Sequence, residues 1–115
     1  MIRLIKAQRR QAGFEQTLKE WGKESKTTFM LDFSIADAFG IKAVYNTYNR
    51  AFAEWKTNVT YMAEFVVVLN HKIWEHYQTN PALGKVYDDL WRKADNYCRE
   101  HFKGEELSYY YNFID

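Results

Sequence analysis

The stretch of residues 59–77, VTYMAEFVVVLNHKIWEHY, limits how this chain can fold more than any other feature. On a helical wheel its apolar residues form two stripes about 120° apart, because successive residues turn by about 100°. The stripes consist of Val59, Met62, Val66, Leu69, Ile73 and Tyr77, and of Tyr61, Phe65 and Val68. A helix that is apolar on two sides needs neighbours on two sides. We therefore expect this helix at the centre of an all-α fold, with only a thin solvent-facing polar strip of Thr60, Glu64, His71, Glu75 and Gln78.

Two amphipathic helices are expected beside it, over residues 41–56 and 81–102. Their apolar side chains recur at spacings of three and four, as on one face of a helix. These residues are Ile41, Val44, Tyr45, Tyr48, Phe52 and Trp55 in the first, and Leu83, Val86, Tyr87, Leu90, Ala94 and Tyr97 in the second. Asn80 followed by Pro81 is typical of a helix start, and Lys103 followed by Gly104 of a helix end. The pattern predicts a compact bundle of three main helices, over about residues 41–56, 59–78 and 81–102.

The apolar stripe of residues 41–56 continues in phase into residues 59–77, so periodicity alone also allows one long helix. That helix would span about 55 Å at 1.5 Å per residue, and it would indicate an elongated dimer. The segment Lys56–Asn58 favours a break instead, because asparagine tolerates the left-handed conformation of a helix end. We predict two helices with a break at these residues.

Outside the three main helices the pattern is weaker. The pattern predicts a short helix over residues 12–24 and a loop or a short extended piece over residues 27–33. Ser34–Asp37 has the pattern of a capping box, which would open a short helix that Gly40 ends. The aromatic tail, residues 105–115, reads either as a last helical turn or as an extended arm. We expect a single helical domain over residues 1–115, with residues 1–28 as a loosely attached basic helix.

Charge and cysteine content narrow the class of protein. The formal net charge is only +1, but residues 1–26 hold seven Lys or Arg against three Glu. This basic segment favours a contact with nucleic acid through Arg3, Lys6, Arg9 and Arg10 as one alternative function. A single cysteine is typical of a reducing cytoplasm, and no apolar run of about 18 residues predicts a membrane span. We expect a cytoplasmic protein with no membrane contact.

No motif for a metal, cofactor or catalytic site occurs in the sequence. His71 and His76 are five residues apart and point about 140° away from each other on a helix, so they are not expected to bind one metal ion. Asn70 and His76 fall inside apolar arcs, where a buried, hydrogen-bonded polar group that fixes helix register is the favoured interpretation. A small enzyme with a site around His76 or Cys98 remains an alternative. We expect a non-enzymatic protein without cofactor or metal.

Aromatic side chains near the end of the chain are the candidate contacts with a partner protein. The tail carries four of them, at positions 109, 110, 111 and 113. These side chains must either pack on the domain or form an interface with a partner or a second copy of the chain, because exposed aromatic residues are common binding anchors. Trp91 and Phe102 lie on the flank of the 81–102 helix. The candidate binding residues are therefore Trp91, Phe102, Tyr109, Tyr110, Tyr111 and Phe113.

Several segments, DFSIADAFG at 32–40, NRAFAEWK at 49–56, VVVLNHKIWEHY at 66–77 and KGEELSYYY at 103–111, resemble a group of small helical proteins. Proteins of this group accompany mobile elements and prophages of gut bacteria, and the resemblance covers about residues 29–115. No catalytic residue carries over, because the group has no assigned activity. The resemblance implies an accessory protein of a mobile element that binds another protein, as an inhibitor of host defence or as a regulator of the element.

Overall fold

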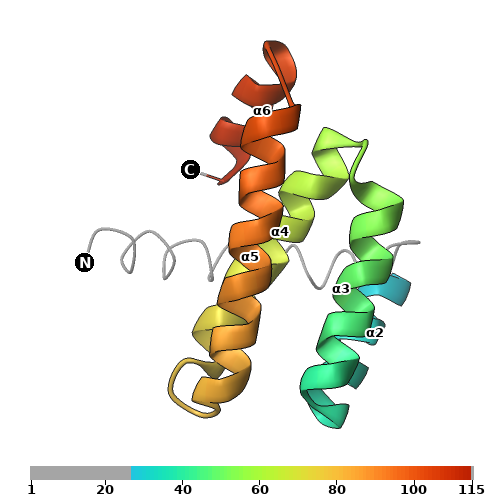
Figure 1. Ribbon diagram of the computed structural model, residues 1–115, viewed down its shortest axis with the longest axis vertical. Helices are drawn as coiled ribbons and strands as arrows, with labels where there is room; N and C mark the ends of the chain where they lie inside the picture. Colours follow the sequence, from blue (N-terminus) through green and yellow to red (C-terminus); the bar gives the residue numbers. More distant parts are fainter. Residues whose placement is uncertain (1–26, 115) are drawn as a thin grey trace. The chain divides into compact units, whose positions relative to one another are not determined.

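A computed structural model describes residues 27–114 of the chain, and within this range it contains five helices and no strand (Figure 1). The helices are α2 (Thr27–Phe39), α3 (Ile41–Trp55), α4 (Val59–His76), α5 (Pro81–His101) and α6 (Glu105–Ile114). The all-α prediction is confirmed. The chain divides into two compact units, residues 1–47 and 48–115, with the boundary inside α3.

The described part of the first unit consists of α2 and the first half of α3. Gly40 ends α2 as predicted: its N–H donates to the Ala36 carbonyl at 2.9 Å, and its φ of 90° suits a residue without a Cβ. The expected loop over 27–33 is wrong, and Ser34 lies inside α2 rather than at its N-cap. Periodicity did not predict this part of the helix, because the apolar residues of α2 are spread around it and form no single stripe.

The second unit begins with the last two turns of α3, which end at Trp55, so the predicted break before α4 is confirmed. The predicted reason for the break, a left-handed Asn58 at the end of α3, is wrong. Asn58 has an extended conformation (φ −118°, ψ 110°), and its Oδ1 accepts a hydrogen bond from the Tyr61 N–H at 3.2 Å. Asn58 therefore acts as the N-cap of α4 and not as a left-handed end of α3.

Helix α4 is the centre of the second unit, as the double apolar stripe predicted. Every residue from Met62 to Asn70 is buried, which amounts to more than two turns with no solvent-facing side. Helix α5 runs antiparallel to α4 and packs along it, and α6 packs on α4 more than on α5 (Figure 1).

The expected polar strip of α4 is covered in part: Glu75 and Gln78 are exposed as predicted, whereas Glu64 is buried, and so is the neighbouring Lys72. Glu64 and Lys72 are each 8% exposed, and the His71 side chain is 13% exposed. The charge of Lys72 is balanced within the helix, because its Nζ lies 3.2 Å from Glu75 Oε2. Periodicity missed this burial because a wheel shows which residues share a face but not what covers that face.

The predicted start of α5 is confirmed, whereas its end differs: the helix stops at His101 with an extended Phe102 as C-cap, so Lys103 lies outside the last turn. The Asn80 Oδ1 accepts from the Leu83 N–H at 3.5 Å, and Pro81 occupies the first turn. Gly104 has a φ of 60° and turns the chain back into α6. The aromatic tail is thus a regular helix of ten residues, with Glu105 and Glu106 favourably placed in its first turn.

Candidate functional site

Six aromatic rings from three helices gather in the second unit, and we call them the aromatic cluster. The second half of α3 supplies three rings, α4 two and α5 one: Tyr48, Phe52, Trp55, Tyr61, Phe65 and Tyr97. Phe52 bridges α3 to α5, because its ring meets Tyr97 edge-on at 5.1 Å. Trp55 bridges α3 to α4 through Tyr61 at 5.4 Å and Phe65 at 6.1 Å. Rings at these separations and tilts stabilise one another beyond their burial alone.

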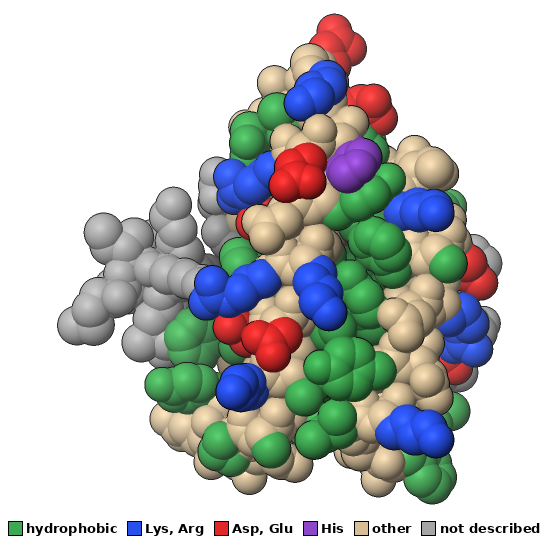
Figure 2. Space-filling model, viewed as in Figure 1, with side chains coloured by type: hydrophobic (Ala, Val, Ile, Leu, Met, Phe, Trp, Pro, Cys, Tyr) green, Lys and Arg blue, Asp and Glu red, His purple; other side chains and the backbone are tan. Residues whose placement is uncertain are grey.

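Exposure rises from the base of the aromatic cluster to its edge. Phe65 and Tyr48 are buried at the base, while Phe52, Trp55 and Tyr97 are half-buried and Tyr61 is 37% exposed. We call these last four residues the aromatic rim. On the face shown in Figure 2, hydrophobic side chains come to the surface alongside α5, beside a mixture of basic and acidic groups. The aromatic rim therefore lies half-buried to exposed above a buried base.

An exposed histidine holds one member of the rim in place. The ring of His101 stacks on Tyr97, with centroids 4.0 Å apart and planes 10° from parallel. Its Nδ1–H donates to the Tyr97 carbonyl at 3.0 Å. Because the ring and the backbone are both engaged, Tyr97 has little freedom to rotate.

The predicted contact residues at the end of the chain separate into two groups. Tyr109 is 41% exposed and stacks on Phe113 at 6.0 Å, while Trp91, Tyr111 and Phe113 are half-buried. Phe102 and Tyr110 are instead 5% and 0% exposed, so in this conformation they belong to the core and not to a contact surface. Helical geometry is the reason: in α6, Tyr110 and Ile114 share the inward face, whereas Tyr109 and Phe113 share another.

A buried polar network joins α6 to α5. The Tyr110 hydroxyl donates to Asp95 Oδ1 at 2.6 Å, and Arg99 Nε donates to Asp95 Oδ2 at 2.9 Å. The Arg99 guanidinium also lies over the Tyr111 ring, 5.0 Å from its centroid. Burial, and then the hydrogen bond to Asp95, raise the pKa of Tyr110 far above its usual value, so this hydroxyl stays protonated and remains a donor.

Cys98, a candidate in the enzymatic alternative, is fully buried beside this network. Burial raises the pKa of its thiol to about 12, and a hydrogen bond with Tyr110 opposes part of that rise. Nucleophilic cysteines need the opposite shift, because the thiolate is the reactive form. Cys98 therefore has the character of a structural thiol.

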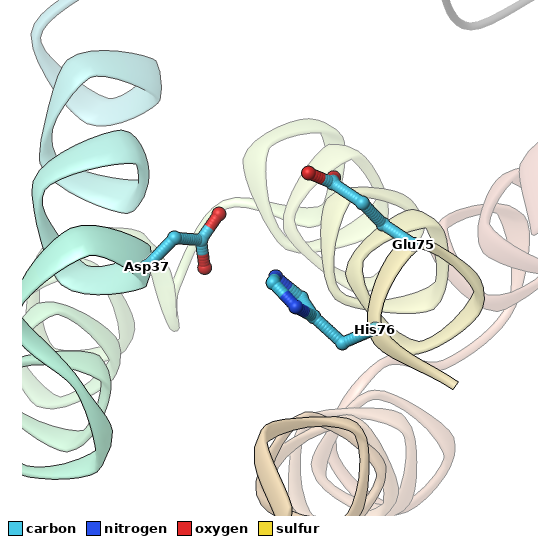
Figure 3. Close-up of side chains that lie close together, drawn as sticks. All are labelled: Asp37, Glu75 and His76. Atoms are coloured by element: carbon cyan, nitrogen blue, oxygen red, sulfur yellow. The ribbon is translucent and has the colours of Figure 1, made fainter. Parts of the chain in front are cut away.

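His76, the other candidate of that alternative, lies in the last turn of α4 beside Glu75 (Figure 3). Its ring is half-buried and stacks on Tyr87 at 5.6 Å. Glu75 pairs with Lys72 and lies 3.7 Å from His71 Nε2, so its charge already has partners on α4. Asp37, the third side chain in Figure 3, comes from α2 in the other unit, and no site is assigned across the two units.

Two further predictions have different outcomes. Asn70 is buried as expected, while its hydrogen-bonding role stays a prediction. The basic residues Arg3, Lys6, Arg9 and Arg10 lie outside the described residues. The aromatic rim was missed as a surface, because the apolar stripes of α3, α4 and α5 were interpreted as core. Four large aromatic rings in those stripes were the available signal.

None of the helices in residues 27–114 combines the length and the apolar character needed to cross a membrane. Comparison with known protein families, with curated proteins and with solved structures finds no match. The resemblance to proteins of mobile elements therefore stays a prediction.

Proposed function

We propose that this chain is a non-enzymatic binding protein that holds an apolar segment of another protein against its aromatic rim. The observation that carries the proposal is the graded burial of the aromatic cluster, from the buried Phe65 to the exposed Tyr61. Rings fixed from below lose little conformational entropy on binding and bury a large area, which is why aromatic residues dominate binding energies at interfaces.

The chemistry of the rim favours an apolar partner segment with hydrogen-bonding groups at its edges. Tyr61 and Tyr97 each offer a hydroxyl, and His101 adds an imidazole next to Tyr97. The chain as a whole has a net charge of only +1, so long-range steering of a strongly charged partner contributes little. An accessory role in a mobile element, as a defence inhibitor or a regulator, rests on the resemblance of residues 29–115 alone.

The buried thiol supports a non-enzymatic role. Cys98, with its pKa raised to about 12, is protonated at neutral pH and lacks solvent access. This environment suits packing and not nucleophilic attack.

The test compares two exposed tyrosines at opposite ends of α4. Tyr61 belongs to the rim, whereas Tyr77, 63% exposed, lies at the opposite end of the helix. Wild type, Tyr61→Ser and Tyr77→Ser would be used as baits in cells of the native host, with quantitative mass spectrometry of captured proteins. Binding of the captured partner, once purified, would then be measured by calorimetry.

We expect one partner that wild type and Tyr77→Ser bind equally and that Tyr61→Ser binds about 30-fold more weakly, as for an interface anchor worth about 2 kcal/mol. Equal binding by all three proteins would contradict the rim as the contact surface. Affinity for DNA or RNA that falls steeply with salt and disappears on deletion of residues 1–10 would instead favour the nucleic-acid alternative.

A further inference from the structure

Helix α6 is attached to the rest of the second unit by a short connection with one free pivot. Phe102 is anchored, because it is buried and its ring meets Tyr97 at 6.3 Å. Lys103 and Gly104 are exposed, and a Cβ added at Gly104 would have nothing within 4 Å. A glycine in open space can change its backbone angles without collision. The pivot of α6 therefore lies at Lys103–Gly104.

The docked face of α6 is small. Only Tyr110 and Ile114 of its ten residues are buried, whereas α4 buries ten residues. Elements with few buried apolar contacts open at a lower free energy than the whole domain. Helix α6 is thus held by less burial than α4 or α5, which bury ten and eight residues.

Its main polar attachment is reversible. Asp95 uses one oxygen for Arg99, within α5, and the other for Tyr110 of α6. When α6 leaves, the pair within α5 persists, and water can satisfy both the freed oxygen and the Tyr110 hydroxyl. A hydrogen bond exchanged for bonds to water contributes only about 1 kcal/mol net, so opening leaves no orphaned buried charge.

Tyr110 also lies beside the only cysteine of the chain. Cys98 follows Asp95 by three residues along α5 and is fully buried, and both Tyr110 and Tyr48 lie near enough to interact with its thiol. Removal of α6 takes Tyr110 away from Cys98 and leaves Tyr48 beside it. The reactivity of Cys98 therefore reports the position of α6.

We propose that α6 is a detachable latch, closed by the Tyr110–Asp95 hydrogen bond, which swings out about Lys103–Gly104 and uncovers Cys98 while α4 and α5 stay folded. The open state presents the face of α4 and α5 that α6 covers. This device is separate from the aromatic rim and does not depend on the proposed binding function.

The test follows the reaction of Cys98 with dithiobis(nitrobenzoate) in the full chain at increasing urea concentrations below the unfolding transition. Labelling through the latch should depend on urea far less than global unfolding does, because opening one short helix exposes little surface. Labelling that has the same urea dependence and the same free energy as global unfolding, measured by circular dichroism, would overturn the proposal.

Two variants of adjacent tyrosines in α6 test whether the Tyr110–Asp95 hydrogen bond holds the latch closed. Tyr110→Phe keeps the ring and removes the bond to Asp95, so it should speed labelling about fivefold to tenfold without changing amide hydrogen exchange in α4. Tyr109→Phe alters an exposed ring of the same helix and should label at the wild-type rate. Equal rates for Tyr110→Phe and wild type would show that this bond does not close the latch.

Discussion

Gly84 in α5 faces the backbone of His76 at the end of α4, so closely that a Cβ on Gly84 would lie 3.5 Å from the His76 carbonyl carbon and oxygen. That separation is ordinary van der Waals contact, so a methyl group just fits, whereas a longer side chain has no room. The position thus sets how near the start of α5 can come to the end of α4.

Gly84→Ala is expected to raise the free energy of unfolding by about 0.5–1 kcal/mol, because alanine favours the helix and fills the contact without displacing it. Gly84→Leu should lower it by more than 1 kcal/mol, since the side chain would push the helices apart. Urea unfolding of the three proteins checks both signs. A stabilised leucine variant would show that the two helices are not in contact at this point.

The caps of α4 and α5 should each contribute measurably to stability. Asn58→Ala and Asn80→Ala remove the side-chain acceptors for the Tyr61 and Leu83 N–H groups, and each should cost about 1 kcal/mol of unfolding free energy. Asn49→Ala, at an exposed position inside α3, is the matched control and should be neutral or slightly stabilising. If all three variants behave alike in urea unfolding, the cap assignment is wrong.

Stability should fall at alkaline pH. Burial raises the pKa of Tyr48 to about 12 from 10.0, and that of the Cys98 thiol to about 12 from 9.0. The folded state then binds more protons than the unfolded state, so this stability is present below pH 9 and is lost as pH rises from about 9 to 12. Urea midpoints measured across this window check the decline.

Variants identify the groups responsible for the alkaline decline. Tyr48→Phe should make it shallower, because one buried titrating hydroxyl is gone. A midpoint that stays constant up to pH 12 in wild type would contradict the burial of these groups.

Asn70 offers a test of register control in α4. If its buried amide is hydrogen-bonded as the sequence interpretation requires, Asn70→Leu should lower the melting temperature, because the bonded partners would lose their acceptor or donor. The nearby Val68→Leu separates this effect from a simple change of volume. An unchanged or higher melting temperature for Asn70→Leu would reject the register role.

The ends of α3, α4 and α5 were predictable because their signals are local. Apolar spacing, the Asn80–Pro81 start and the break at Lys56–Asn58 depend on residues next to one another, although Asn58 acts as the N-cap of α4 and not as the predicted end of α3. The first half of α2, residues 27–33, escaped prediction because the apolar residues of this helix show no period.

By itself, the sequence determined an all-α chain with a doubly apolar central helix, since those properties follow from the order of side chains along one helix. Only the tertiary structure decided which faces were covered. It buried Glu64 and Tyr110, left Tyr61 and Tyr109 at the surface, and placed Cys98 next to Tyr110. The reason is physical: burial depends on neighbours that lie far away in sequence, and residues with equal local preferences differ only in what packs against them.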